Sequence, residues 1–199
     1  MANSLDAQHI STNLANYEAA RSGFFSFIVS GLNNIVKSTY SGGDPEAAQA
    51  SDRYGSNTEE VIKLNVVKSS VPHFSLEVLE YRRGNEVVKF AGVPTLEAGS
   101  LTVDDVVGLD TKGILMAWQA LGYDVHTRRG GRMVNYKRDC TLVEYTQDYQ
   151  QIRQWKLYGC WISEISEDDF DKESDGKRQV TATIQYDRAE MQEVAVETA

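Results

Sequence analysis

Residues 155–161, WKLYGCW, and residues 180–186, VTATIQY, decide the fold. In both stretches apolar and aromatic residues recur at every second position, which is the spacing of side chains on one face of a β-strand. The later stretch shows a dry face made of Val180, Ala182, Ile184 and Tyr186. Its opposite face is polar and uncharged, and consists of Gln179, Thr181, Thr183 and Gln185. One dry face and one wet face predict an antiparallel sheet that is packed on one side.

The earlier stretch carries tryptophans at alternating positions. Simple alternation puts on one face Trp155, Leu157, Gly159 and Trp161. The other face then carries Lys156, Tyr158 and Cys160. A platform for stacking sugars is conceivable, but tryptophans at such positions, and Trp118 on a helix, are more often part of a packed core. We therefore expect all three tryptophans in the core.

Further apolar and β-branched runs predict strands at 24–29, 61–67, 74–82, 87–90, 140–147, 152–165 and 177–187. Gly84 and Asn85 form the turn between two of these strands, so residues 74–90 read as a hairpin. The predicted class is mainly β: an antiparallel β-sandwich or partial barrel.

One helix is expected beside the strands. Asp110 or Thr111 can cap its N-terminus, and Gly122 can end it. Its apolar face is formed by Ile114, Leu115, Trp118 and Leu121. Because such a face must be covered, the helix should flank the sheet.

The length of 199 residues fits one domain. We expect an N-terminal arm over residues 1–22 and a β-sandwich domain over residues 23–188. Residues 41–58, rich in Ser, Gly, Asp, Glu and Ala, read as an inserted surface loop. Residues 189–199 read as a loose, acidic C-terminal tail.

The formal net charge of −9 argues against a protein that grips nucleic acid, because such proteins need basic patches to neutralise phosphates. No run approaches the roughly 18 apolar residues of a membrane span, and the N-terminus does not read as a signal peptide. Two cysteines do not make a disulfide scaffold. These features predict synthesis in a cytoplasm and no contact with a membrane.

No catalytic motif is evident. His9, His73 and His126 are scattered, and no nucleophile elbow or carboxylate pair accompanies them. The basic glycine turn at 128–132 lacks the lysine of a phosphate-binding loop. The acidic run at 168–176 resembles a calcium loop until its twelfth position, where Ala182 replaces the required glutamate. We expect no enzyme activity, no cofactor and no metal.

Cys140 and Cys160 lie on two consecutive predicted strands. If these strands form a hairpin that pivots near Gln150, the two cysteines face each other directly. Cytosolic proteins rarely keep disulfides, which favours reduced thiols. A bridge within or between subunits stays open as the alternative.

An ordered series of motifs connects these elements. It comprises 74–76 (FSL), 90–92 (FAG), 99–105 (GSLTVDD), the Trp118 helix, 136–139 (YKRD), 155–161 and 184–187 (IQYD). Over residues 61–188 the chain resembles the tail tube proteins of contractile-tailed phages and related injection machines. Two features depart from the family pattern: Ile162 stands where relatives often carry proline, and the insertion at 41–57 has no evident counterpart.

The resemblance implies a non-enzymatic structural subunit that stacks as hexameric rings into a hollow conduit for DNA inside a contractile sheath. Strands from each subunit would join an inner β-barrel that no single subunit can close. The implied partners are other copies of the chain, a sheath protein, baseplate and terminator proteins, a tape-measure protein and transiting DNA. The implied location is the virion tail, after synthesis in the host cytoplasm.

Some alternatives remain at this point. The polar face at Gln179, Thr181, Thr183 and Gln185 could line the channel or lie under the sheath. The conduit could deliver protein instead of DNA. From a different class, the chain could be a receptor- or carbohydrate-binding β-sandwich at a tail tip, which predicts exposed aromatic residues and a small oligomer.

Overall fold

The computed structural model describes residues 21–32, 57–106, 109–125, 128–168 and 176–193. The predicted N-terminal arm, inserted loop, calcium-like loop and C-terminal tail therefore lie wholly or mostly outside the described residues, as do His9 and His126. The remaining elements can be compared directly with the expectations.

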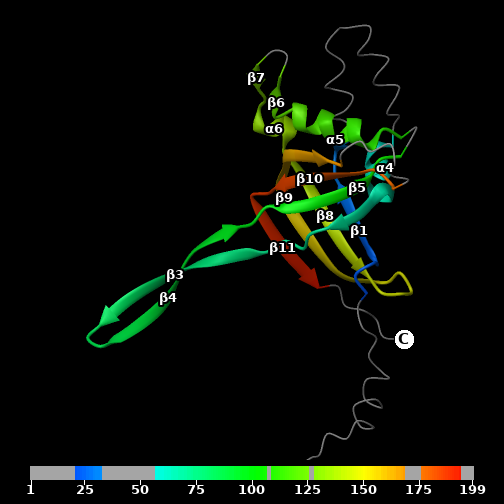
Figure 1. The fold of residues 1–199 in the computed structure, drawn as a ribbon. Helices are drawn as coiled ribbons and strands as arrows, with labels where there is room; N and C mark the ends of the chain where they lie inside the picture. The colour runs from blue at the N-terminus through cyan, green and yellow to red at the C-terminus, as the bar shows by residue number, and fades with distance from the viewer. Residues whose placement is uncertain (1–20, 33–56, 107–108, 126–127, 169–175, 194–199) are drawn as a thin grey trace, which may run out of the picture.

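An antiparallel, seven-stranded sheet forms the body (Figure 1), which confirms the predicted fold class. Its strand order is β1-β8-β9-β10-β5-β2, and β11 also pairs with β9. The bounds are β1 Phe25–Val29, β2 Val66–Ser69, β5 Gly99–Asp104, β8 Arg138–Tyr145, β9 Gln151–Glu167, β10 Gln179–Gln185 and β11 Arg188–Glu193.

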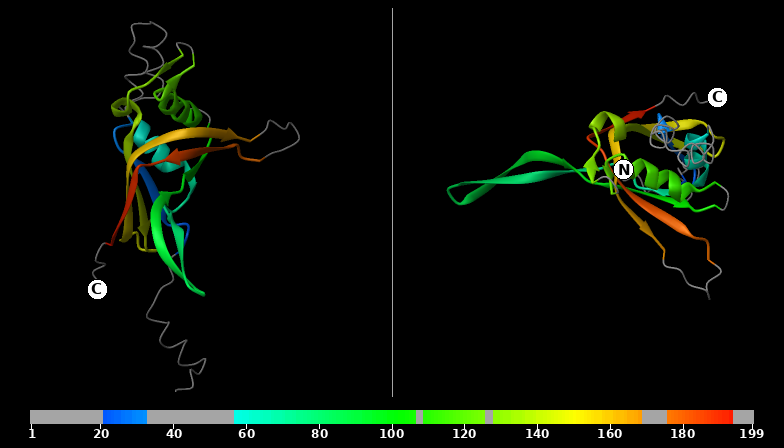
Figure 2. Two further views of the ribbon diagram at one scale, coloured as in Figure 1. Left: turned by 90° about the vertical axis from the view of Figure 1, so that its left-hand side faces the viewer. Right: turned by 90° about the horizontal axis from the view of Figure 1, so that it is seen from above.

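The 17-residue strand β9 belongs to both halves of the body. Its first part pairs with β8 on one edge and with β11 on the other. Its second part, from Trp161 to Glu167, pairs with β10. The sheet therefore curves around β9, and its two halves enclose the core between them, as the two views in Figure 2 show.

Inward-facing side chains of both halves form a single hydrophobic cluster. From the strands it includes Phe27, Val29, Leu101, Val103, Leu142, Leu157, Cys160, Val180, Ala182 and Ile184. Helix α5, Thr111–Ala120, adds Ile114, Leu115 and Trp118. The Trp118 Nε1–H donates to the carbonyl of Tyr136 at 2.8 Å, so the one polar atom of this buried ring is satisfied.

Local sequence explains the start of α5. The Asp110 side chain accepts a hydrogen bond from the Gly113 amide at 3.2 Å, which satisfies one of the free N–H groups of the first turn. The predicted cap, helix and stop before Gly122 are confirmed.

The strand predicted over 61–67 is wrong. Residues Thr58–Asn65 form helix α4, and β2 begins only at Val66. Glu59 and Glu60 lie in the first turn and Lys63 in the last, which complements the helix dipole. Only a helix can bury Ile62 against the core while it leaves Leu64 exposed, since both would share a face in a strand.

The chain also stays ordered beyond residue 188. Residues Arg188–Glu193 form β11 on the edge of β9, and Ala189 packs against the core. The expectation of a loose chain from residue 189 is therefore wrong as far as Glu193.

The predicted hairpin is confirmed, and it projects from the body (Figure 1). Among the described strands, β3, Phe74–Arg83, and β4, Glu86–Leu96, pair only with each other. A smaller hairpin of β6, Tyr123–Asp124, and β7, Arg129–Gly130, precedes the short helix α6, Met133–Tyr136. The basic glycine stretch at 128–132 thus lies in a small surface hairpin. Among the described residues, no helix is long and apolar enough to cross a membrane.

Candidate assembly surface

We call strands β3 and β4 the projecting hairpin. Every residue of β3 is exposed, and so are nearly all of β4. Nine large apolar side chains of the hairpin are 41% to 71% exposed: Phe74, Leu76, Val78, Leu79, Tyr81, Val87, Val88, Phe90 and Val93. A contiguous apolar surface of this kind marks an interaction site, and a two-stranded hairpin is only marginally stable by itself.

The register divides these side chains between the two faces of the ladder. Leu79 pairs with Phe90 and Tyr81 with Val88, so these four residues share one face; we call them the tip cluster. The pair of Glu80 and Lys89 lies on the other face, with a salt bridge of 3.3 Å.

Nearer the body the apolar residues lie on that other face. Phe74 pairs there with Leu96, which packs against the hydrophobic core. The ladder shifts between Leu76 and Val78, where Gly92 approaches Glu77 so closely that a Cβ would lie 2.9 Å from the Glu77 carbonyl oxygen. A glycine is needed at this bulge because the two backbones nearly touch.

The root of the projecting hairpin is firmly attached. Ser70 and Ser100 are joined twice: the Ser70 amide donates to the Ser100 carbonyl at 2.9 Å, and the Ser100 amide donates to Ser70 Oγ at 2.8 Å. The carbonyl of His73 accepts from the Glu97 amide at 3.3 Å and from the Tyr186 hydroxyl at 3.4 Å. These bonds fix the direction in which the hairpin leaves the body.

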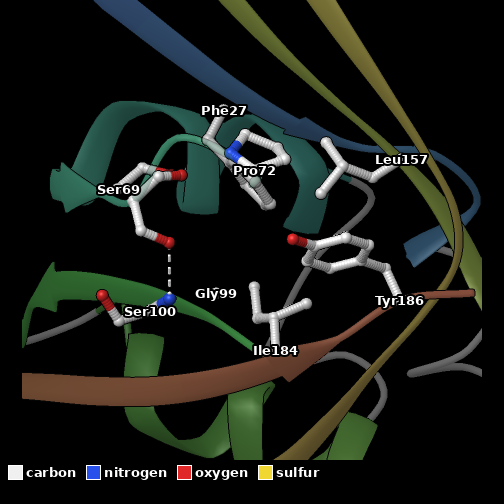
Figure 3. A pocket seen from close by; sticks show the side chains of 9 residues that line it. Phe27, Ser69, Pro72, Gly99, Ser100, Leu157, Ile184 and Tyr186 are labelled. Atoms are coloured by element: carbon white, nitrogen blue, oxygen red, sulfur yellow. Dashed lines mark hydrogen bonds between the residues drawn. The ribbon is translucent and has the colours of Figure 1, made fainter. Parts of the chain in front are cut away.

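A small cavity lies behind this root (Figure 3). It measures about 10 Å³ and is lined by Phe27, Ser69, Ser70, Pro72, Gly99, Ser100, Leu157, Ile184 and Tyr186. That volume is about what one water molecule needs, so the cavity is a small gap in the packing between the hairpin root and the body, and not a ligand site.

The polar face of β10 lies on the outside of the sheet. Gln179, Thr181, Thr183 and Gln185 are half-buried, while the residues between them are buried. Their side chains bond to neighbouring strands: Thr181 Oγ1 lies 3.1 Å from Thr102 Oγ1, and the Gln179 amide donates to Asp104 Oδ1 at 3.0 Å. The polar groups of this face therefore largely satisfy one another through bonds between neighbouring strands.

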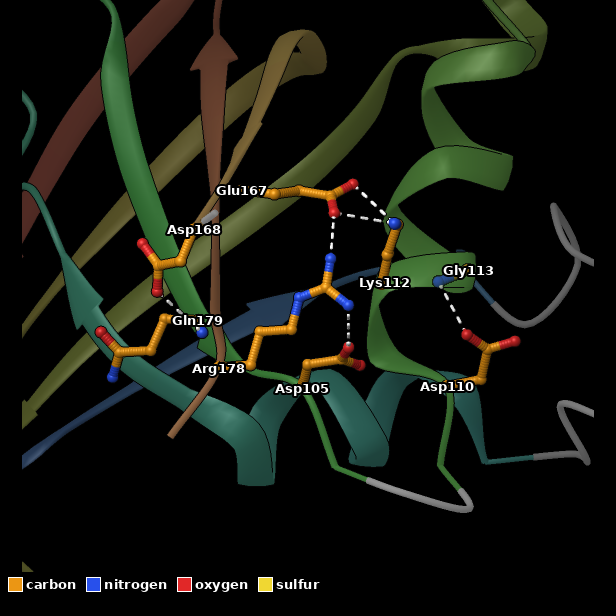
Figure 4. A network of polar contacts seen from close by, with 8 residues as sticks. All are labelled: Asp105, Asp110, Lys112, Gly113, Glu167, Asp168, Arg178 and Gln179. Atoms are coloured by element: carbon orange, nitrogen blue, oxygen red, sulfur yellow. Dashed lines mark hydrogen bonds and ion pairs between the residues drawn. The ribbon is translucent and has the colours of Figure 1, made fainter. Parts of the chain in front are cut away.

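A charged network closes the end of this sheet next to α5 (Figure 4). Glu167 forms ion pairs with Lys112, at 2.7 Å, and with Arg178, which also lies 4.0 Å from Asp105. The hydrogen bond from Lys112, followed by the charge of Arg178, lowers the pKa of Glu167. The network ties α5, β9 and the residues just before β10 together.

Two grooves open on the body. The α5–β9 groove has a volume of about 540 Å³ and is lined by Met116, Gln119, Ala120, Gly122, Tyr123, Val125, Tyr136, Trp161, Ile162 and Ser163. The β1–β2 groove has a volume of about 840 Å³, and its lining includes the charged residues Arg21, Lys68 and Glu144. None of the described residues that line the first groove is charged.

The predicted motif residues divide between core and groove. Trp118, Leu157 and Tyr186 are buried, and Trp155 packs against the core. Trp161 is half-buried in the α5–β9 groove, with its ring centroid 6.1 Å from that of Tyr136. The expectation that Trp161 lies in the core with Leu157 is wrong.

Gly159 causes this change of face. It has a φ of +67°, and the β8–β9 register shifts beside it. The extra residue of this bulge moves Cys160 onto the buried face and Trp161 off it.

The same bulge changes the cysteine register. Cys140 lies opposite Leu157, and Cys160 lies opposite Arg138, so the expectation that the cysteines are directly opposite each other is wrong. Both are free and buried in the described structure. Burial and a hydrogen bond with Cys160 raise the pKa of Cys140 well above its usual value.

Sequence reasoning missed the apolar exposure of the hairpin and the groove beside α5. A signal was present: Val78 and Leu79 are consecutive apolar residues, so the strand has no purely polar face to leave in water. In the described part of the chain, no group of three or more His, Cys, Asp or Glu residues is placed to hold a metal.

Solved structures share this fold at low sequence identity. The sheath–tube complex of the PVC extracellular contractile injection system in its extended state contains a chain with 15% identity and a TM-score of 0.59, over 92% of this chain and 98% of that one. A chain in the anti-feeding prophage cap, which terminates the tube, has 13% identity and a TM-score of 0.63, over 98% and 100%. A search of curated proteins finds no significant sequence match.

The family model of the T4-like virus tail tube protein gp19 matches residues 57–190. That range includes both strands of the projecting hairpin, α5 and all of β9 and β10. It covers more than half of the chain and confirms the resemblance found in the sequence. The chain therefore belongs to the family of T4-like virus tail tube proteins.

Proposed function

We propose that this tail tube protein assembles as hexameric rings that stack into a hollow conduit for DNA, inside a contractile sheath. The observation that carries the proposal is the projecting hairpin, which exposes nine large apolar side chains on two neighbouring strands. Such a surface needs a partner, and a chain that builds a tube meets other copies of itself on several sides.

The sheet supplies a suitable channel wall. On the polar face of β10 and β5, the Thr181 and Thr102 hydroxyls bond to each other and the Gln179 amide donates to the Asp104 carboxylate. A wall of this kind has few free groups to bind a passing polymer. The net charge of −9 also makes the chain as a whole unfavourable for holding phosphates. We therefore place Gln179, Thr181, Thr183 and Gln185 on the channel side.

The edges of the same sheet suggest how the wall closes. Strand β2 pairs with β5 on one edge only among the described strands. At the opposite border, no described strand pairs with the second edge of β9 between Trp161 and Glu167. Between these borders the directions alternate, so β2 of one copy can meet β9 of the next copy as an antiparallel neighbour. Pairing there would hide both edges within a ring.

The remaining partners follow from the family and the particles in which similar folds occur. The solved neighbours come from a sheath–tube complex and a tube cap. On that basis we propose contacts with a sheath protein, a baseplate and a terminator, with a tape-measure protein in the channel. A conduit of this kind works by shape and charge, and needs no catalytic centre.

Electron microscopy of the purified full chain tests the proposal. Negative stain over a range of protein and salt concentrations should show rings that lengthen into tubes. Particles that remain monomeric, or stop as small open oligomers under every condition, would support the tail-tip alternative instead.

A tube of the same architecture could instead deliver protein. One of the two structural neighbours is described as part of an extracellular contractile injection system, so we keep a protein cargo as the second candidate. Retention of labelled double-stranded DNA and of labelled unfolded polypeptide by assembled tubes separates the two cargo classes. A DNA conduit should retain neither strongly, because the chain is acidic on average and the polar groups of the wall bond to one another, whereas a protein conduit should retain the polypeptide.

A further inference from the structure

We infer that the α5–β9 groove receives the tip cluster of the projecting hairpin from a second copy of the chain. This assignment rests on the proposed self-assembly and names the surface that the hairpin contacts.

The groove is suited to an apolar insert. Its lining residues carry no formal charge, and Met116, Tyr123 and Val125 are 49%, 54% and 77% exposed. Burying these side chains removes apolar surface from water without desolvating a charge. Contacts between the lining residues hold the groove in shape: the Gln119 amide donates to the Ser163 carbonyl at 3.3 Å, and the Tyr136 ring packs on Trp161.

The tip cluster is suited to fill such a groove. Leu79, Tyr81, Val88 and Phe90 form two neighbouring cross-strand pairs, and each side chain is 41% to 63% exposed. They lie on the outer half of the hairpin, where a partner can cover them without meeting the body from which the hairpin projects (Figure 1). Paired aromatic and β-branched side chains are efficient contact groups.

Charge favours a second copy as the occupant. The whole chain carries −9, but residues 74–96 contain three acidic and three basic residues, so the hairpin is its neutral part. An acidic neighbour repels this segment least. Both surfaces also end in a cross-strand pair of opposite charges, Arg83 with Glu86 on the hairpin and Asp124 with Arg129 beside the groove. When the hairpin enters the groove, the two pairs can lie with each cation next to the anion of the other pair.

Geometry makes the contact one between copies. The hairpin leaves the side of the sheet, whereas α5 and the β6–β7 hairpin lie together at another end of the body (Figures 1 and 2). A knob on one surface and a hole on a different surface make a heterologous contact, which is the kind that builds rings and filaments.

The β1–β2 groove is a poorer receptor. It is larger, but an apolar insert there would bury surface beside Arg21, Lys68 and Glu144. Its lining also includes Val71, which belongs to the root of the chain's own hairpin. The two observations favour the uncharged groove beside α5.

Two complementary variants test the assignment. Variant one carries Leu79→Asp and Phe90→Asp, which damages the tip cluster and leaves the groove intact. Variant two carries Met116→Asp and Val125→Asp, which damages the groove and leaves the hairpin intact. The control is Leu64→Asp, since Leu64 is 73% exposed on α4, outside both surfaces. Sedimentation velocity measures assembly, and far-ultraviolet circular dichroism checks that each variant is folded.

We expect each variant to stay monomeric at concentrations where the wild type and the Leu64 control assemble. An equimolar mixture should form a one-to-one heterodimer, because the intact hairpin of variant two fits the intact groove of variant one. That dimer cannot grow through further hairpin–groove contacts, since its free hairpin and its free groove are the damaged ones. A hundredfold or greater preference for the mixed dimer over either self-dimer is the expected size, because each self-dimer would have to bury two unpaired carboxylates.

Assembly of variant two like the wild type would overturn the assignment. So would two monomeric variants that fail to associate when mixed, because the groove would then serve another contact. If the wild type forms no rings or tubes but the mixture still dimerises, the receptor assignment stands and the tube proposal fails. If neither occurs, both fail.

Discussion

Cys160 hydrogen-bonds to Cys140 inside the core, although the β8–β9 ladder places Leu157, not Cys160, opposite Cys140. The bulge at Gly159 brings the two thiols onto the same buried face. Neither sulfur is accessible to solvent in the folded subunit. Proximity alone would favour a bridge, but burial disfavours the thiolate that must attack to form one.

We therefore predict that both thiols stay reduced and unreactive in the folded protein. A disulfide reagent such as 5,5′-dithiobis(2-nitrobenzoate) should label neither cysteine within minutes at neutral pH, and should label both in denaturant. Intact mass after purification in air should match two free thiols. Rapid labelling of the native protein, or a mass lower by two hydrogens, would contradict this prediction.

The ion pairs of Glu167 predict an acid-sensitive contribution to stability. The pKa of Glu167 is lowered in the folded protein, first by the hydrogen bond from Lys112 and then by Arg178. A lowered carboxylate pKa stabilises the fold above the unfolded-state pKa, and the contribution is lost as the pH falls through the folded-state pKa. The melting temperature of Glu167→Gln should therefore lie below that of the wild type at pH 7.

The difference between the two melting temperatures should shrink as the pH falls below about 4.5, the ordinary pKa of a glutamate. Glu164→Gln is the matched control, because Glu164 is an exposed carboxylate on the same strand. A difference that stays constant from pH 7 to pH 3 would show that Glu167 acts by packing and not by charge.

Structural features were predicted correctly where the residues that determine them lie close together in the sequence. The buried and polar faces of β10 could be read from the sequence because its alternation is unbroken and β5 and β9 border it on both sides. Helix α5 could be read because its cap, apolar face and stop all lie within thirteen residues, 110–122.

The missed features depend on contacts between distant segments. Strand β11 exists because the edge of β9 is available to it, which residues 188–193 cannot reveal. The face of Trp161 depends on a bulge that forms where Gly159 passes close to Asp187. The projecting hairpin is exposed because its strands lie outside the seven-stranded sheet. β-propensity indicates that a segment is a strand, but not which other element covers it.

Gly159 should tolerate a side chain poorly. Its φ of +67° is unfavourable for other residues, and a Cβ would collide with the Asp187 carboxylate, which Lys137 holds at 2.6 Å. We predict that Gly159→Ala lowers the free energy of unfolding by roughly 1–3 kcal/mol. Urea unfolding followed by tryptophan fluorescence measures it.

Gly23→Ala provides the comparison, because nothing lies within 4 Å of a Cβ built at Gly23. Its stability should stay within about 0.5 kcal/mol of the wild type. Equal effects at the two glycines would mean that the bulge can relax without a glycine.

Assembly should change the dynamics of the projecting hairpin more than those of the body. Strands β3 and β4 have only each other for support, so their amides should exchange with deuterium through frequent local opening in the dissociated subunit. The ladder between β10 and β5, whose apolar face lies in the core, is the internal reference.

Once a neighbouring subunit covers the hairpin, each 1.4 kcal/mol gained on docking slows exchange through opening about tenfold. Exchange of dilute subunits and of pelleted tubes, compared peptide by peptide, should thus show the largest added protection at residues 78–91. Equal protection of those peptides in both states would mean that the apolar surface of the hairpin stays uncovered in the tube.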